Sequence, residues 1–515
     1  MQDESSTLHG ALLNGVARER YRASPGRWWV LLCFFLMGVL QAGEWNIYSP
    51  VYPTVLRAFP SWTPKFMNWA INSANVSFMM VIGYAAYGAQ RFGPRKATLV
   101  SASFLVLSAG LRCVPAPDGQ LQKSLTVLSM LLNGCGGAWF SFGGPMLSEA
   151  WFPANQRTAA TAVSVSAVAM GQAVGFVVGP AVVGTTQPGD TPEMARAQLD
   201  RLFYIECAAT CVVALMCVVY YPDRPREPPS ESAACKRRGA AATWRSNMSQ
   251  PVLPPIEEGS STATTACEEH SHEAQGTGES SFGVFFCCSA PGVWHSSLRK
   301  YWLIALACAV PTGVFQGWGS VLYQSISALH LTEDEAAWLG FWMTTAGCAG
   351  AVVVGTVLDR IAGRLKMASA MLMTIALLSY AAFSANASGW LPLTHAASVR
   401  VAYVTGILGG ACFNCSTPVL FELLMETVYG WGDEGVGSML SVLANTMIQI
   451  AFLVLMAIID QDASKLWISW LNAGAMAAGA AAILLTRVEY RRLAVDRGVP
   501  LAEAGSRFDR VVGCL

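Results

Sequence analysis

The feature that most constrains the fold of this chain is a run of apolar residues that recurs many times, each about 20 residues long. A run of that length can cross the hydrocarbon core of a bilayer, where only a helix pairs every backbone amide within its own segment. Of the 515 residues, 53% are hydrophobic and 13% are charged, whereas a soluble protein carries about 25% charged residues. The sequence therefore predicts an all-α membrane protein.

Twelve candidate transmembrane spans fall into two groups of six. The first group covers approximately residues 28–56, 67–89, 96–114, 124–149, 157–182 and 201–221. The second covers approximately residues 301–326, 336–358, 366–385, 398–424, 435–459 and 464–486. Two equal sets of spans are typical of a transporter built from two pseudo-symmetric halves. We therefore predict two six-helix bundles and twelve transmembrane helices.

The segment between the two groups is rich in Pro, Ser and Glu and has too few apolar residues to form a core, so it is predicted to be a disordered linker. The expected organisation is an N-terminal tail (1–26), an N-terminal bundle (27–221), the linker (222–298), a C-terminal bundle (299–486) and a C-terminal tail (487–515). When tails and linker are placed in the cytosol, most of the 33 Lys and Arg residues lie there too, as the positive-inside rule requires. Both termini are predicted to be cytosolic.

Charge and cysteine usage narrow the classes of function. The formal net charge is zero, which gives no indication of a nucleic-acid partner. The 15 cysteines are scattered, mostly within apolar spans, where they behave as small hydrophobic residues. We find no nucleotide-binding loop and no His, Cys or Asp cluster with the spacing of a metal site or a nucleophile. We therefore expect neither an enzyme nor a cofactor or metal site, and we expect ion or solute gradients to supply the energy.

The stretch "QAGEWNIYSP" places an acid, Glu44, deep in the first span. An acid at mid-membrane costs about 2.5–3.5 kcal/mol on insertion scales. Gln41, Glu44, Trp45 and Tyr48 follow helical spacing and are expected to share one face. We expect this face to line a cavity, with Gln41, Trp45 and Tyr48 binding substrate and Glu44 carrying a proton. The alternative is that Glu44 is paired inside the bundle.

The seventh span holds a counterpart in "AVPTGVFQGWGSVLYQ", where Gly and Pro residues loosen the helix around Gln316 and Trp318. Polar and aromatic groups near a helix interruption, in equivalent spans of the two halves, indicate a site near the membrane midplane. We expect Gln316 and Trp318, with Asn414 of the tenth span, to bind substrate. Simple packing of each tryptophan is the alternative.

Two short motifs after spans 2 and 8 predict a gate. "GTVLDRIAGRLK" and "AQRFGPRK" both resemble the Gly-x-x-x-Asp-Arg-x-Gly-Arg-Lys signature of the major facilitator superfamily. The acid of such a turn can face the positive N-terminal end of a neighbouring helix and hold one state of the gate. The first copy has Gln90 in place of the acid. The alternative is an ordinary positively charged turn. The expected gating residues are Asp359, Arg360, Arg364, Arg91 and Arg95.

Polar residues elsewhere in the spans allow two readings. Glu422 and Glu426 are one helical turn apart, and two like charges at that spacing can couple transport to protons or form a gate salt bridge. Glu206 and Asn133 are interpreted as helix–helix hydrogen-bonding residues. The sequence "YRRL", Tyr490–Leu493, looks like a sorting signal.

Several stretches also resemble a known family. "EWNIYSP", "GLRCVP", "WFPANQRTAATA", "AVPTGVFQGW" and "FELLMETVY" are similar to the solute carrier 49 family of the major facilitator superfamily, in the branch named after "disrupted in renal carcinoma". The feline leukaemia virus subgroup C receptor transporters are relatives in the same family. The resemblance extends from about residue 27 to residue 492, apart from the linker.

The resemblance implies a major facilitator fold and alternating access. For the closest branch it implies proton-coupled export of pyridoxine from lysosomes, so we expect a small organic solute, protons and the bilayer as partners, and a monomer in an endomembrane. For the receptor branch it implies choline or ethanolamine transport at the plasma membrane, with Trp45 matching a tryptophan of the cation cage. A membrane receptor or sensor that binds solute without moving it is a further alternative of a different class.

Overall fold

The computed structural model describes residues 23–48, 50–184, 191–237, 293–320, 329, 333–361, 363–429, 434–458, 466–488 and 490–497. Helices dominate this part of the chain, and it contains no β-strand. Ten of its helices are long and apolar enough to cross a membrane. The expectation of an all-α membrane protein is confirmed.

In the part of the chain that the structure describes, each half contributes six long helices. Those of the N-terminal half are α2 (Gly26–Trp45), α4 (Pro64–Phe92), α5 (Pro94–Arg112), α6 (Gln120–Trp151), α7 (Arg157–Val183) and α8 (Pro192–Val219). Those of the C-terminal half are α12 (Val293–Ser320), α14 (Glu333–Arg360), α15 (Leu365–Ala387), α16 (His395–Val428), α17 (Glu434–Ile458) and α18 (Leu466–Leu485). Short elements among the described residues include α3 (Tyr52–Ala58), the 3-10 helix η1 (Ala154–Gln156) and α19 (Arg491–Asp496).

The first predicted span is shorter than expected. Helix α2 ends at Trp45, and the chain turns at residues 46–48 before α3 begins at Tyr52. Pro53 occupies one of the first two positions of α3, where a missing amide hydrogen is tolerated. The single helix predicted over residues 28–56 is therefore wrong at its C-terminal end. Tyr48 lies beyond α2 and does not continue the face of Gln41 and Glu44.

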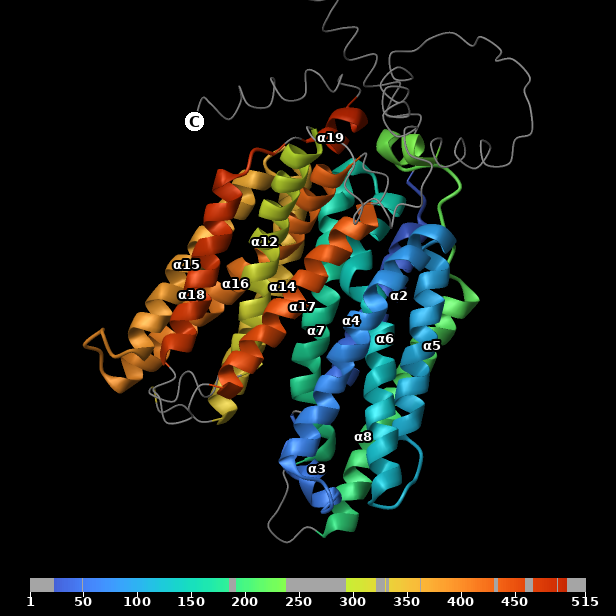
Figure 1. The fold of residues 1–515 in the computed structure, drawn as a ribbon, viewed down its shortest axis with the longest axis vertical. Coiled ribbons are helices and arrows are strands. Elements are labelled where there is room, and N and C mark those ends of the chain that lie inside the picture. Colours follow the sequence, from blue (N-terminus) through green and yellow to red (C-terminus); the bar gives the residue numbers. More distant parts are fainter. Residues whose placement is uncertain are drawn as a thin grey trace, which may run out of the picture.

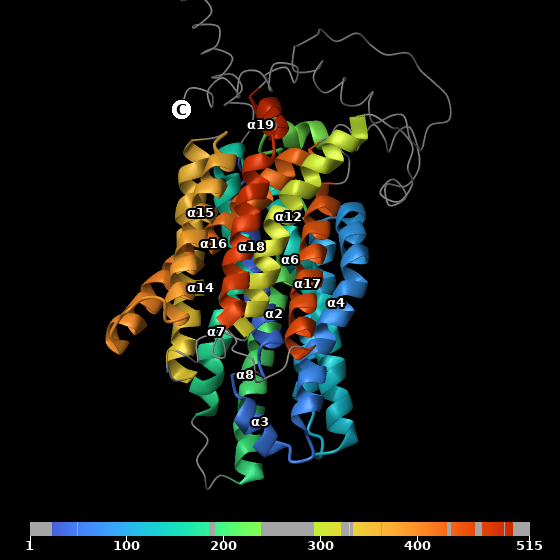
Figure 2. The same ribbon diagram turned by 60° about the vertical axis from the view of Figure 1, so that its left-hand side comes forward.

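The long helices run roughly parallel to one long axis (Figure 1), and the turned view in Figure 2 shows the same arrangement. We call the end at which α19 lies the linker end, because α8 ends and α12 begins there (Figure 1). Within the N-terminal half α2 packs on α7, α6 and α8, and within the C-terminal half α12 packs on α17, α18 and α16. The two halves meet where α14 and α16 pack on α7 and where α17 packs on α4 and α6.

Close contacts between the halves run from the linker end to about the middle of α7 and α14. Gly355 of α14 comes so near to α7 that a Cβ atom there would lie 3.0 Å from the Cα atom of Ala159. Deeper in the bundle, the thiol of Cys348 donates to the carbonyl of Ser166 over 3.8 Å. The structure is therefore closed at the linker end.

Part of the predicted disordered linker is ordered. Residues 231–237 are helical, and Lys236 forms an ion pair with Glu149 of α6 at 3.1 Å. Ser230 and Ser232 accept hydrogen bonds from Arg157. These polar contacts, together with the buried Ala233 and Ala234, hold this part of the linker on the N-terminal half. The linker from residue 238 to residue 292 lies outside the described residues.

Candidate transport and gating sites

Glu44 lies in the interior of the N-terminal bundle. It is one residue before the end of α2, and its side chain has no exposed surface. The guanidinium of Arg112, the last residue of α5, donates from Nη2 to Glu44 Oε2 over 2.7 Å. In this conformation Glu44 therefore contacts a cation within its own bundle and does not face an open chamber.

Arg112 also binds a second acid. Its Nη1 donates to Oε2 of Glu206, from α8, over 2.8 Å. The side chain of Glu206 is 12% exposed, whereas those of Glu44 and Arg112 are at most 1% exposed. Two carboxylates from α2 and α8 thus share one guanidinium from α5. We call Glu44, Arg112 and Glu206 the buried triad.

Neutral hydrogen-bond donors complete the surroundings of Glu44. Thr210 of α8 donates to Oε1 over 2.9 Å, and the Asn133 amide of α6 donates to Oε2 over 3.3 Å. Gln41 donates to the side-chain oxygen of Asn133 over 3.2 Å. Gln41 is therefore connected to the triad through Asn133. The sequence indicated an interhelical role for Asn133 but did not identify Arg112 or Thr210 as partners of Glu44.

The two aromatic residues predicted beside Glu44 point elsewhere. Trp45 is half-buried and packs edge-on against Phe78 of α4, with ring centroids 6.0 Å apart. Tyr48 is buried and packs against Trp62 and Phe203. Of the two, Trp45 alone keeps a partly exposed face in this structure.

The three residues of the C-terminal half that are predicted to bind substrate also differ in their surroundings. Trp318 is completely buried, with its ring 5.6 Å from Tyr380 and 5.7 Å from Phe383, both of α15. Gln316 and Asn414 are partly exposed, and the Asn414 amide donates to the carbonyl of Gly410 on its own helix. The described contacts do not bring α2 and α12 together into one site, so a shared substrate site between them stays a prediction.

Asp359, at the end of α14, lies between the two halves at the linker end. Its two carboxylate oxygens accept hydrogen bonds from the backbone amides of Thr158 and Ala159, each over 2.9 Å. These amides open α7, where the helix dipole favours a negative charge. Asp359 thereby joins the C-terminal half to the first turn of an N-terminal helix.

The equivalent turn of the N-terminal half carries Gln90 and meets the start of α17. A Cβ atom on Gly435 would lie 3.0 Å from the amide nitrogen of Gln90, and this amide nitrogen is buried without a hydrogen-bond partner among the described residues. Asp223 instead binds the turn, accepting from the Arg95 backbone amide over 3.1 Å. The four arginines predicted for the gate have exposed side chains: Arg91, Arg95, Arg360 and Arg364.

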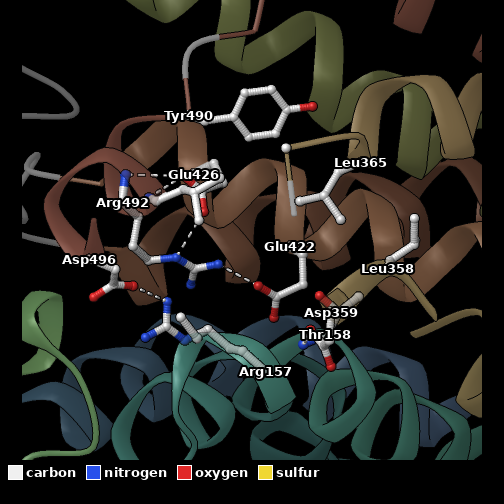
Figure 3. A pocket seen from close by; sticks show the side chains of 13 residues that line it. Arg157, Thr158, Leu358, Asp359, Leu365, Glu422, Glu426, Tyr490, Arg492 and Asp496 are labelled. Atoms are coloured by element: carbon white, nitrogen blue, oxygen red, sulfur yellow. Dashed lines mark hydrogen bonds and ion pairs between the residues drawn. The ribbon is translucent and has the colours of Figure 1, made fainter. Parts of the chain in front are cut away.

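Glu422 and Glu426, near the end of α16, are buried and bound to Arg492 of α19 (Figure 3). Arg492 donates from Nη2 to Glu422 and from Nε to Oε1 of Glu426, the latter over 3.3 Å. Glu422 also accepts from Ser148 of α6 and Thr161 of α7, so it contacts both halves. The structure therefore shows ion pairs at this place, and a gating role for them stays a prediction.

Arg492 is only 2% exposed. Its burial lowers the pKa of the guanidinium, but Glu422 and Glu426 outweigh burial and raise that pKa well above its ordinary value. Arg492 therefore stays charged throughout the physiological pH range. The proposed "YRRL" sorting signal contains this arginine, and Tyr490 is also buried, so neither side chain is available to a receptor in this conformation.

Comparison with known proteins agrees with this architecture. The sequence profile of the Major Facilitator Superfamily matches residues 34–431. The chain belongs to this superfamily. Its fold is therefore that of a multi-pass membrane transporter.

Curated relatives point to the same part of the superfamily. "Solute carrier family 49 member 4 homolog" of Xenopus tropicalis is 28% identical over 486 residues, which cover 91% of this chain and 93% of the relative. "Choline/ethanolamine transporter FLVCR1" of Mus musculus is 24% identical over 450 residues, which cover 84% of this chain and 69% of the relative. The resemblance to solute carrier 49 proteins predicted from the sequence is confirmed.

Solved structures show the same fold. The proton:xylose symporter XylE bound to 6-bromo-6-deoxy-D-glucose matches with a TM-score of 0.65 and 15% identity, covering 95% of this chain and all of that chain. The E. coli fucose:proton symporter FucP, in the outward conformation, matches with a TM-score of 0.61 and 15% identity. The match covers 89% of this chain and 98% of the FucP chain. At this identity the likeness supports the fold and not the substrate.

Proposed function

We propose that this transporter couples protons to the export of a small organic solute of the pyridoxine type from lysosomes. The observation that carries the proton part of the proposal is the buried triad, in which Arg112 lies within hydrogen-bonding distance of both Glu44 and Glu206. The solute and the organelle follow from the resemblance to one branch of solute carrier 49 proteins.

Charge balance explains why the triad suits a proton. Two ionised carboxylates around one guanidinium leave a net negative charge in the membrane interior, where an unbalanced charge is expensive. Binding one proton makes the group neutral. Glu206 is the more accessible acid, with 12% of its side chain exposed, so we assign proton exchange to Glu206. We assign to Glu44 the role of transmitting the change in the charge of the triad to α2.

The closed linker end fits this direction of transport. With the termini and linker in the cytosol, the described conformation is closed toward the cytosol, with Asp359 on the first turn of α7. Solute and proton would then enter from the opposite, luminal side. Trp45 is half-buried, so the exposed part of its indole can stack on a heteroaromatic ring.

The test uses purified protein in liposomes with pyridoxine and an imposed pH gradient. Wild type should transport pyridoxine faster when the compartment that holds it is acidic. Glu206→Gln should remove this acceleration. Glu193→Gln is the matched control, because Glu193 is an exposed glutamate in the first turn of the same helix, and it should behave as wild type. Equal acceleration in Glu206→Gln would reject the assignment.

A choline or ethanolamine facilitator is the second candidate. It is favoured by the partly exposed indole of Trp45, since an aromatic face attracts an organic cation. The similarity to relatives named choline/ethanolamine transporters also favours it. Competition for uptake separates the two candidates. Inhibition by choline and not by pyridoxine, without dependence on a pH gradient, would favour the facilitator. Binding of solute without any movement across the bilayer would favour a receptor.

A further inference from the structure

Helix α19 lies outside the twelve long helices, at the linker end of the molecule (Figures 1 and 2). It is six residues long and contains Arg492 and Asp496, which have opposite charges. Nothing in its sequence predicts that it packs on the transport domain, yet Ala494 is completely buried and Val495 nearly so. The helix is docked on the molecule.

Its first residues bind the C-terminal half. Besides its side-chain bonds to Glu422 and Glu426, Arg492 donates its backbone amide to Oε2 of Glu426 over 3.0 Å. The backbone amide of Leu493 donates to the same oxygen over 3.2 Å. Glu426 thus receives three hydrogen bonds from α19, and the start of this helix is fixed to the end of α16.

Its last residue binds the N-terminal half. Asp496 accepts from Nη1 of Arg157, the first residue of α7, over 3.1 Å, and each side chain is 4% exposed. The other oxygen of Asp496 accepts from the backbone amide of Ser232 over 2.8 Å. Figure 3 shows Arg492 directed toward the α16 acids and Asp496 directed toward Arg157. One short helix therefore holds α16 of one half and α7 of the other.

We propose that α19 is a clasp that holds the transporter closed at the linker end, and that its bond to Arg157 must break before this end can open. The closed state gains a buried ion pair between the two halves. When the halves separate, α19 can remain on one of them only. It stays on α16, to which Arg492 and Leu493 bind it, so Arg157 and Asp496 lose each other as partners. The ordered linker residues Ser230 and Ser232 add to the clasp on the N-terminal side.

Asp496→Asn tests the proposal in the full-length protein, because it removes the charge on the N-terminal side and leaves the bonds of Arg492 in place. The readout is hydrogen–deuterium exchange of residues 434–446, at the start of α17, which packs on α4 and α6 and reports opening at a distance from α19. Exchange there should become at least about fivefold faster, as expected when about 1 kcal/mol of closing free energy is lost.

The matched control is Asp200→Asn, which breaks an ion pair with Arg196 inside a single helix, α8. It should leave the exchange of residues 434–446 unchanged. Faster exchange confined to residues 491–497 in Asp496→Asn, or no change anywhere, would overturn the clasp. If Asp496→Asn does not fold, the charge exchange Arg157→Asp with Asp496→Arg decides the question. Recovery of slow exchange in this double variant supports the clasp, and failure to recover it contradicts the clasp.

Discussion

The interiors of the two bundles differ at equivalent places. In the N-terminal half, the first, third and sixth long helices bring together Glu44, Arg112 and Glu206. In the C-terminal half, the first and third long helices bring together Trp318, Tyr380 and Phe383. One half therefore buries charge where the other buries aromatic rings. We infer that the two bundles have different roles. The N-terminal bundle responds to protons, and the C-terminal bundle provides a stable packed core.

The largest effect should come from removing the shared cation. Arg112→Met leaves two buried acids without their partner, and breaking a buried ion pair in this way costs about 3–5 kcal/mol. Thermal unfolding in detergent should show a large fall in Tm. Adding Glu44→Gln and Glu206→Gln to Arg112→Met should restore much of the loss, since the group is then neutral. An unchanged Tm in the single variant would contradict the buried triad.

In the C-terminal bundle, we expect a substitution to lower stability without changing the response of transport to pH. Trp318→Ala removes a fully buried indole and should destabilise the protein by about 3 kcal/mol. Because no charge changes, transport by the folded fraction should keep its acceleration by a pH gradient. The measurements are Tm and pyridoxine transport at two luminal pH values. Loss of the pH response in Trp318→Ala would remove the proposed division between the bundles.

The two gate turns offer a sharper comparison. Asp359→Asn removes the charge that two α7 amides bind and should weaken the closed state by about 1–2 kcal/mol. Gln90→Ala in the equivalent turn removes a side chain whose amide nitrogen has no partner among the described residues, so we expect a change below about 0.5 kcal/mol. Hydrogen exchange of Thr158 and Ala159 measures the first effect. Equal effects of the two variants would contradict the asymmetry of the gate.

The smallest effect is expected from a neutral neighbour of the triad. Thr210→Val removes the hydrogen bond to Glu44 and should lower stability by about 1 kcal/mol. Ser103→Ala is the control, because Ser103 is exposed and its hydroxyl donates to the carbonyl of Leu99 on its own helix. Tm measurements compare the two. A larger loss in Ser103→Ala would argue against an ordered network around Glu44.

The helical fold could be predicted from the sequence because the bilayer fixes both the length and the apolarity of a span. The end of α2 could not be predicted from the sequence. The spacing of Trp45 and Tyr48 is that of one helical face, but the turn at residues 46–48 separates them in the structure. The sequence likewise marked Glu44 as unusual, because an acid in an apolar run is rare. The partners of Glu44 could not be predicted, because Arg112 is 68 residues away along the chain.

Arg492 and Asp496 were missed for a different reason. They lie in a short charged stretch after the last span, where the sequence pattern is that of a cytosolic tail. Their role depends on the opposite charges of Glu426 and Arg157, which lie 66 and 339 residues away. Sequence spacing carries no signal for such contacts.

The most direct test of proton coupling measures proton movement driven by solute alone. Liposomes containing the transporter and an internal pH-sensitive dye are given a pyridoxine gradient, with no pH gradient imposed. Wild type should carry protons in the direction of pyridoxine flow and change the internal pH, whereas Glu206→Gln should move pyridoxine without that change. Pyridoxine flow through wild type with a constant internal pH would contradict the proposed role of the buried triad.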